Sequence, residues 1–388
     1  MTDGQPNYSL RAGAFVSQPS GYRAFIPAEL PPTPPIDLDG DLSQLLSKAD
    51  LSLGRLDGVA LILLNPDLFL AMYVKQEAVL SSQIEGTQST LQDILALESG
   101  AKHIGQPTDI GDIVNYIAAL NFGIKRLEDI PLSSRLIREI HEKLLADSRG
   151  QHQEPGRFRE SQNWIGPAGA GLSGAAFVPP PAYELNRALG NLEKFLNERN
   201  LMPPLVQIGL AHGQFETIHP FLDGNGRVGR LLITLFLCER KILKRPLLYL
   251  SVYLKKHRSE YYDRLMAIRT DGDWEGWLRF FLRGVAEVSE SAATTAKQIV
   301  DLRESIRQRL ANASSAKAAH RVLDLIFEKP VITVATVQTE LNCSFTSANK
   351  IIKLFEISGL LVEFTGQRRN RCYRFEQYLR LFTGNAAD

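Results

Sequence analysis

Apolar residues recur at helical spacing along most of this chain. After Asp41 the first such face consists of Leu42, Leu45, Leu46, Ala49 and Leu53. The same period predicts further helices over residues 66–84, 109–127, 132–147, 182–199, 204–218, 225–240, 258–269 and 274–309. Ser133 is suited to cap the helix that follows it, and Gly86 to stop the helix that starts at Pro66. We therefore expect a mostly α-helical protein.

Three segments depart from this period. Residues 1–40 carry seven prolines, which predicts an extended arm that is ordered only where it lies against the body. Residues 166–174 are rich in glycine between apolar flanks, and residues 363–373 suggest a short hairpin.

A second unit is expected at the C-terminal end. The small, polar run 311–315 separates it from the helical body. Within it, helices are expected over 319–327, 333–341 and 346–358, and Gly359 ends the third helix before the hairpin. This order of elements resembles a winged helix.

Composition narrows the class of protein. The 388 residues are enough for two or three units, and 44 Lys and Arg against 43 Asp and Glu leave a net charge of +1, too small to attract nucleic acid or membranes globally. Cys238, Cys343 and Cys372 form no Cys-x-x-Cys pair, which argues against disulfides and a cysteine zinc site. With no leader pattern and no apolar run that could span a bilayer, we expect a cytoplasmic protein without a membrane partner.

The densest polar chemistry lies between two apolar helices, over residues 219–230, His-Pro-Phe-Leu-Asp-Gly-Asn-Gly-Arg-Val-Gly-Arg. Its glycines and Asn225 let the backbone approach a ligand closely. The following helix turns its N-terminus into the loop, which favours an anion, and Arg227 and Arg230 suit phosphate oxygens. A polyphosphate is therefore the expected ligand.

Two further residues of the loop fit that ligand. Asp223 supplies one carboxylate, and one carboxylate with phosphate oxygens is a usual way to hold magnesium. His219, with a reference pKa of about 6.5, is suited to accept a proton near neutral pH. Taken alone, Asp-Gly-Asn-Gly also fits a simple polar turn with both arginines in solvent.

The twelve residues match the Fic signature H-P-F-x-D-G-N-G-R-x-x-R at every defined position. The resemblance implies a protein adenylyltransferase that moves AMP from ATP to a Ser, Thr or Tyr hydroxyl of a target protein or of itself, with release of pyrophosphate. It implies that His219 is the base and that Asp223 holds Mg²⁺. The implied ATP-binding residues are Glu85, His219, Gly224, Asn225, Gly226, Arg227, Val228, Gly229, Arg230 and Tyr262. The related kinase-type branch carries lysine at position 226, so Gly226 favours AMP transfer.

The resemblance extends over roughly residues 15–290, through segments 81–86, 112–120, 155–159 and 248–265. It implies a mostly α-helical Fic core with a β-hairpin flap, followed by the winged helix. The expected division is an N-terminal arm and helices over 1–108, a catalytic core over 109–310 and the winged helix over 316–388. Similar proteins place a tyrosine near the adenine, which we carry onto Tyr262. Packing of Tyr261 and Tyr262 in the core is the alternative.

Residues 169–174 match Gly-x-Gly-x-x-Gly, a pattern also found in dinucleotide sites. The context differs, because no strand precedes the segment and Pro179-Pro180-Pro181 follows it. In Fic proteins this place is the flap, which pairs with the backbone of the target. A plain flexible loop is the alternative.

Residues 81–86, Ser-Ser-Gln-Ile-Glu-Gly, place a carboxylate at the negative end of a helix, at a cost of roughly 0.3–1 kcal/mol. The segment resembles the inhibitory motif [S/T]-x-x-x-E-[G/N] of Fic proteins, in which Ser81, Glu85 and Gly86 take the defined positions. The resemblance implies that Glu85 pairs with Arg230 and inhibits the enzyme. A solvated Glu85 with Gly86 as a helix cap is the alternative.

The C-terminal unit carries a net charge of +3, with Lys350 and Lys353 on its third helix and Arg368, Arg369 and Arg371 in the hairpin. This distribution suits DNA, while protein binding and a homodimer stay open. Two other functions are compatible with the signature: a DNA-binding regulator whose Fic fold senses nucleotide, and removal of AMP from a target with Glu85 orienting water. His141, His212 and His320 are interpreted as ordinary helix residues.

Overall fold

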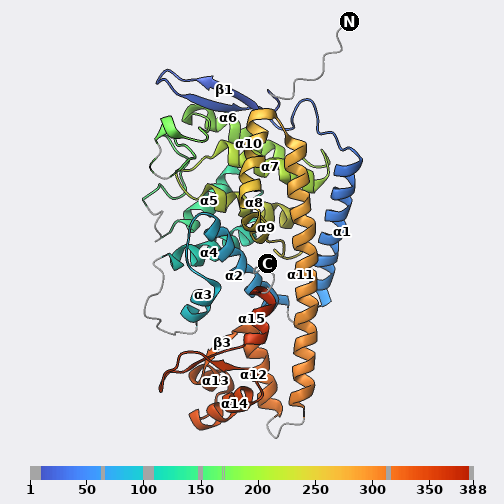
Figure 1. The fold of residues 1–388 in the computed structure, drawn as a ribbon, viewed down its shortest axis with the longest axis vertical. Helices are drawn as coiled ribbons and strands as arrows, with labels where there is room; N and C mark the ends of the chain where they lie inside the picture. The colour runs from blue at the N-terminus through green and yellow to red at the C-terminus, as the bar shows by residue number, and fades with distance from the viewer. Residues whose placement is uncertain are drawn as a thin grey trace.

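Two long helices run side by side along one edge of the molecule (Figure 1). They are α1 (Gly40–Ile62) and α11 (Trp274–Leu310), whose 37 residues extend about 55 Å. The computed structural model describes residues 10–62, 66–98, 109–146, 152–167, 169, 171–311 and 316–383. Asp273 caps α11 by accepting a hydrogen bond from the Gly276 N–H at 2.8 Å.

The long helices follow the periodic segments closely. They are α2 (Pro66–Ile84), α4 (Ile110–Arg126), α5 (Ser134–Leu144), α6 (Leu185–Asn197), α7 (Pro204–Ile218), α8 (Asn225–Glu239) and α10 (Arg258–Asp271). Ser133 caps α5, because its Oγ accepts from the Leu136 N–H at 3.3 Å. The sequence did not predict α3 (Leu91–Glu98), α9 (Ser251–Lys256) or α15 (Glu376–Thr383), which are too short to establish a period.

The N-terminal arm lies against the body, and part of it forms regular secondary structure that the sequence did not predict. It forms a hairpin of β1 (Gly13–Ser17) and β2 (Arg23–Pro27), paired from Gly13↔Pro27 to Ser17↔Arg23. The Phe25 N–H donates to the Val178 carbonyl at 2.9 Å, and Arg11 forms a bidentate ion pair with Glu275 of α11. Residues 1–9 of the predicted arm lie outside the described part.

The glycine-rich segment is closed at its base by one antiparallel bridge, Ile165↔Phe177. Inside it, a single 3₁₀ turn covers Leu172–Gly174, and residues 168 and 170 lie outside the described part. Because Val178 also accepts from the arm, the N-terminal hairpin lies next to this segment.

The C-terminal unit has its three helices and its hairpin in the order that the sequence predicted, but the short strand between the first two helices was not predicted. It runs through α12 (Ala316–Glu328), β3 (Val331–Thr333), α13 (Val334–Leu341), α14 (Phe345–Ile357), β4 (Val362–Glu363) and β5 (Cys372–Arg374). The strands form an antiparallel sheet in the order β3-β5-β4. Of the predicted boundary at 311–315, only Ala311 is described.

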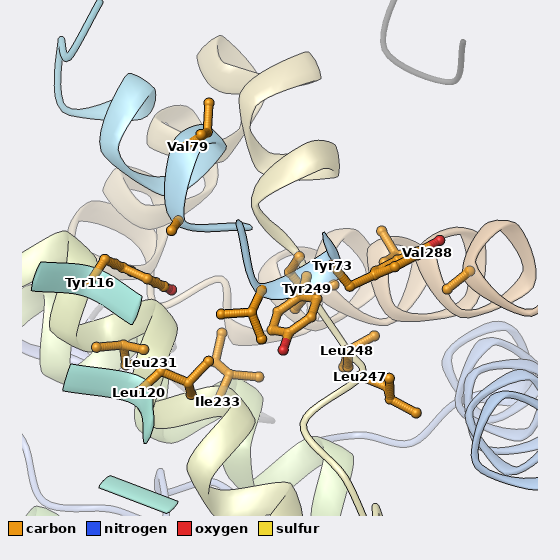
Figure 2. Packing of buried hydrophobic residues seen from close by; sticks show 14 of the residues in the cluster. Tyr73, Val79, Tyr116, Leu120, Leu231, Ile233, Leu247, Leu248, Tyr249 and Val288 are labelled. Carbon is orange, nitrogen blue, oxygen red and sulfur yellow. The ribbon is translucent and has the colours of Figure 1, made fainter. Parts of the chain in front are cut away.

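Helix α2 lies at the centre of the molecule, between the body and the C-terminal unit. Figure 2 shows Tyr73 of α2 beside Tyr249 and Val288, and each fully buried large apolar side chain contributes about 1.5–3 kcal/mol. The Gln76 amide of α2 donates to the Phe382 carbonyl of α15 at 2.7 Å, and the Phe382 ring lies 5.4 Å from the Tyr73 ring. The middle of α2 therefore packs against both the body and the C-terminal unit.

None of the helices in the described residues combines the length and the apolar character that a membrane span needs.

Candidate functional site

Residues 219–224 form the loop that joins α7 to α8, with left-handed residues at both ends, and residues 225–230 of the motif form the first turns of α8. His219 ends α7 at φ +48°, and Gly224 precedes α8 at φ +76°, where glycine is favoured. The Asn225 side chain holds the loop closed: its Oδ1 accepts from the Phe221 N–H and its Nδ2 donates to the Phe221 carbonyl, both at 2.8 Å. The loop is thus rigid, and buried Val228 donates the first helical bond of α8, to the Gly224 carbonyl at 3.0 Å.

Two side chains from residues 159–163 hold this loop by hydrogen bonds to its backbone carbonyls. Arg159 is 2% exposed and donates from Nε to the His219 carbonyl at 2.9 Å, while its own N–H donates to the Pro220 carbonyl. Asn163 donates to the Phe221 carbonyl at 2.9 Å. Sequence reasoning did not assign roles to Arg159 or Asn163, because only the fold brings residues so far apart together.

His141 of α5 also belongs to this support, although the sequence suggested only an ordinary helix residue. The Gly156 N–H donates to its Nδ1 at 2.9 Å, so Nε2 carries the proton and donates to the Asp223 carbonyl at 3.0 Å. The ring stacks on Phe221 with centroids 3.7 Å apart. Burial lowers the pKa of His141 to about 4, so it is neutral at physiological pH.

His219 stands at the entry of the loop and is half-buried. Burial lowers its pKa to about 3, and the positive charges of Arg269 and Arg159 act in the same direction. The imidazole is therefore neutral at pH 7 and free of the proton that a general base must accept.

Arg230 connects the signature loop to the last turn of α2. Its buried guanidinium donates from Nε to Ser81 Oγ at 2.7 Å, and from Nη2 to the Ser81 carbonyl at 2.9 Å and to Glu85 Oε1 at 2.8 Å. Burial opposes the charged form, but the Glu85 carboxylate outweighs it and raises the pKa of Arg230 above its usual value. The guanidinium also puts a cation at the negative end of α2, which compensates for the carboxylate there.

Glu85 lies just beyond α2, before Gly86, which turns at φ +96°. Its side chain is 37% exposed, against 2% for Arg230. A Cβ at Gly226 would come within 2.2 Å of Glu85 Oε1, so the carboxylate sits against the first turn of α8. The free N–H groups of that turn favour an anion, and Glu85 takes this place.

Asp223 and Arg227 flank the same turn. Asp223 Oδ1 accepts from the Gly224 N–H at 2.6 Å, and its half-exposed carboxylate lies 3.4 Å from Arg227 Nη2. The buried Nε of Arg227 has no hydrogen-bond partner among the described residues. Within the same residues no three His, Cys, Asp or Glu side chains form a metal cage. A single carboxylate fits magnesium that arrives with a nucleotide, because phosphates and water supply the remaining ligands.

The two tyrosines of α10 have different surroundings. Tyr261 is buried, and its hydroxyl donates to His212 Nε2 at 2.9 Å, which leaves Nδ1–H of this histidine to donate to the Gly229 carbonyl at 3.0 Å. Tyr262 is 40% exposed under the Arg258 guanidinium. Burial raises the pKa of the Tyr262 hydroxyl, and the charge of Glu85 acts in the same direction.

Glu216 is a further buried carboxyl group at the site, and no sequence motif singled it out. It lies on α7 one turn before His219, and its Oε1 has no hydrogen-bond partner among the described residues. Burial raises its pKa to about 7, although the charge of Arg230 acts against that shift. A Cβ at Gly229 would come within 2.4 Å of the same oxygen.

Comparison with known proteins gives two family matches. Residues 43–125 match the model described as Fic/DOC family N-terminal, and residues 131–237 match the model described as Fic/DOC family. The chain is 29% identical over 209 residues to the protein adenylyltransferase Fic of Aedes aegypti, covering 53% of this chain and 36% of that protein. The same enzyme of Drosophila grimshawi gives 29% identity, with 53% and 37% covered. The matches thus span little more than a third of these relatives' length.

Solved structures share the fold. A Fic family protein from Desulfovibrio desulfuricans G20 aligns with a TM-score of 0.60 at 21% identity, over 88% of this chain and 97% of that one. A Fic domain-containing signaling protein from Bacteroides thetaiotaomicron aligns with a TM-score of 0.51 at 19% identity, over 67% and 97%.

Proposed function

Because this chain belongs to the Fic/DOC family, we propose that it is a protein adenylyltransferase that moves AMP from ATP to a Ser, Thr or Tyr hydroxyl. The observation that carries the proposal is the loop itself, in which a neutral His219 stands beside the N-terminus of α8 with Arg227 and Arg230. A base next to an anion site is what phosphoryl-type transfer to a hydroxyl requires. The relatives named protein adenylyltransferase Fic support the same activity.

In this mechanism the protein supplies position, charge and a base. His219 takes the proton of the attacking hydroxyl, whose oxygen forms a bond to the α-phosphorus while the bond to the β-phosphate oxygen breaks and pyrophosphate leaves. The N–H groups of Gly226 and its neighbours, with Arg227, hold the phosphates, and Asp223 is the ligand for Mg²⁺ bound with ATP. Magnesium supplies neutralisation of phosphate charge when present.

We also propose that Glu85 inhibits transfer in the resting protein. The carboxylate neutralises Arg230 and lies against the first turn of α8, where a nucleotide phosphate would bind. ATP then binds only with its γ-phosphate displaced, which turns the α-phosphate away from the line of attack. Small misplacements of this kind cost about 10²-fold in rate.

Target and adenine contacts complete the proposal. The segment 166–174 would pair with the target's backbone beside the Ile165↔Phe177 bridge, and Tyr262 would contact the adenine with its exposed ring. A cytoplasmic location is part of the same hypothesis.

A second candidate function is the removal of AMP from a modified target. The partly exposed Glu85 carboxylate next to the phosphate site favours it, because a carboxylate there is placed to orient water. A regulator that only senses nucleotide is the third candidate, and it would form no covalent product.

The test uses α-labelled ATP with the wild type, Glu85→Gly and Glu85→Gly/His219→Ala. We expect Glu85→Gly to label itself or a target far more than the wild type, because Arg230 becomes available to the γ-phosphate. Loss of the base in the double variant should lower the rate by about 10²–10⁴-fold while ATP binding persists. Equal labelling by the wild type and Glu85→Gly contradicts inhibition by Glu85, and persistent labelling by the double variant contradicts the role of His219.

A further inference from the structure

The C-terminal unit contains a groove that AMP transfer does not use. It lies between α14, the start of α13 and the hairpin of β4 and β5, and its volume is about 730 Å³. Asn349 and Lys353 of α14 line one side, and Arg368 and Arg369 of the hairpin line the other. It is separate from the signature loop, because none of its lining residues belongs to the helical body.

The charge on this groove is strongly positive although the chain as a whole is nearly neutral. Lys353, Arg368 and Arg369 form no ion pair within the described residues, and Glu356 is the one acidic residue among those that line the groove. Cations held in one concave place without protein partners raise the local concentration of a polyanion. The groove therefore favours a ligand rich in phosphates.

The shape of the unit selects among such ligands. Helix α13 ends at Asn342 in a left-handed conformation, and Ser344 caps α14 by accepting from the Ser347 N–H at 3.2 Å. This short turn sets two helices at an angle, as in a helix-turn-helix. One face of α14 is buried through Ala348, Ile351, Ile352 and Phe355. On the opposite face Lys350 and Lys353 are exposed and Asn349 is half-buried.

We propose that this groove binds double-stranded DNA, with α14 in the major groove and the β4–β5 hairpin on the adjacent phosphates. A projecting helix fits the width of the major groove, and Asn and Lys side chains are donors to base edges and phosphates there. Phe345, 60% exposed at the start of α14, provides apolar surface for a thymine methyl group. The proposal uses no step of AMP transfer.

The experiment measures binding of the full chain, without ATP, to a fluorescent DNA duplex of about two helical turns by anisotropy. The test variants are Arg368→Ala/Arg369→Ala and Lys353→Ala. The matched control is Lys317→Ala/Arg380→Ala, which removes the same charge as the arginine pair from exposed positions outside the groove. Circular dichroism verifies that each variant is folded.

We expect the arginine pair variant to bind at least about tenfold more weakly than the wild type at low salt, and the control to bind as the wild type does. The slope of log affinity against log salt should fall by about 2 in the pair variant. Three results would overturn the proposal: equal weakening by the control, tighter binding of single-stranded RNA than of the duplex, or self-association of the chain in place of DNA binding. The outcome is independent of whether Glu85→Gly labels itself, so failure of one proposal is distinguishable from failure of the other.

Discussion

Two glycines of the signature each leave room for a different carboxyl group. The space above Gly226 holds the Glu85 carboxylate and that above Gly229 holds the Glu216 carboxyl, so neither position accepts a side chain without displacing an acid. Glu85 reaches its place from a turn beyond α2 and is partly exposed, whereas Glu216 is buried in α7. Substitution by alanine at each glycine therefore tests the role of one carboxyl group without disturbing the other.

Gly226→Ala is expected to increase AMP transfer. The added methyl group would lie 2.2 Å from Glu85 Oε1, the end of a flexible side chain, so it should push the carboxylate off Arg230. Initial labelling rates with α-labelled ATP, measured in the wild type and in a Glu85→Gly background, are the test. In the second background the methyl group has no carboxylate to displace, and the rate there reports its crowding of the nucleotide and of Arg230, whose Nη1 would lie 3.0 Å from the added carbon.

Gly229→Ala is the matched control for this prediction. Its methyl group would be directed at Glu216 and should give no gain. If Gly226→Ala accelerates labelling equally with and without Glu85, the effect does not pass through Glu85 and the prediction is wrong.

Asp223→Ala is expected to lower both the rate and its dependence on magnesium. In the proposed mechanism this half-exposed carboxylate is the side chain that places the ion against the phosphates. Asp223→Asn, which keeps a neutral oxygen ligand, should be intermediate. Magnesium titration of the rate in the Glu85→Gly background measures the effect, and an unchanged titration curve would remove Asp223 from the metal site.

At the scale of elements, the long helices could be predicted from the sequence. For α2 the periodic pattern, Pro66 at the start and Gly86 just past the end predicted both ends of the helix, because these signals are local. The hairpin of β1 and β2 was not predicted, since its pairing depends on tertiary contacts such as that between Phe25 and Val178.

The same distinction holds within the site. The site residues in segments 219–230 and 81–86 could be predicted, because each segment is a contiguous motif in the sequence. Arg159 and His141 act through hydrogen bonds to backbone carbonyls of the loop, and such contacts leave no spacing in the sequence. Glu216 resembles any acidic helix residue until its burial is known.

At the scale of the whole molecule, acid should destabilise the protein below pH 6.5. Burial lowers the pKa of His141, His212 and His219 to about 4, 4 and 3. Between pH 6.5 and 4 these histidines are therefore protonated in the unfolded chain but neutral in the folded protein, which favours unfolding as the pH falls. Each such proton costs about 1.4 kcal/mol of stability per pH unit. Glu216, whose pKa is raised to about 7, acts in the opposite direction, as do Glu77 and Asp50, whose pKa values burial also raises. The slope measured below reports the balance between these carboxyl groups and the three histidines.

Urea unfolding midpoints from pH 7.5 to 4.5 test this expectation, with pH values chosen about the reference pKa of histidine. His212→Gln should flatten the decline whatever it does to the stability at pH 7.5. The control is His320→Gln, on the helix α12, which should leave the slope unchanged. A slope that is the same in all three proteins would show that the buried histidines do not set the acid response.

The arrangement of the units also predicts a connection between the C-terminal unit and Glu85. Helix α15 contacts α2, the helix whose last turn carries Ser81, through the Gln76 amide and the rings of Phe382 and Tyr73. Figure 1 shows α15 between the body and the rest of the C-terminal unit. Because Arg230 is held by the last turn of α2, anything that loosens this helix should weaken the hold of Glu85 on Arg230.

Phe382→Ala is therefore expected to increase AMP transfer as well as to loosen α2. The side chain is 2% exposed, and removing a buried Phe costs about 3–5 kcal/mol where the site cannot collapse. We expect faster amide hydrogen exchange in peptides from α2 and α15 and a severalfold gain in labelling, with no further gain in a Glu85→Gly background. Arg380→Ala, on the exposed side of α15, is the control. Faster exchange in α2 without any gain in labelling would mean that α2 tolerates loosening without releasing Arg230, and unchanged exchange would mean that α15 does not restrain α2 at all.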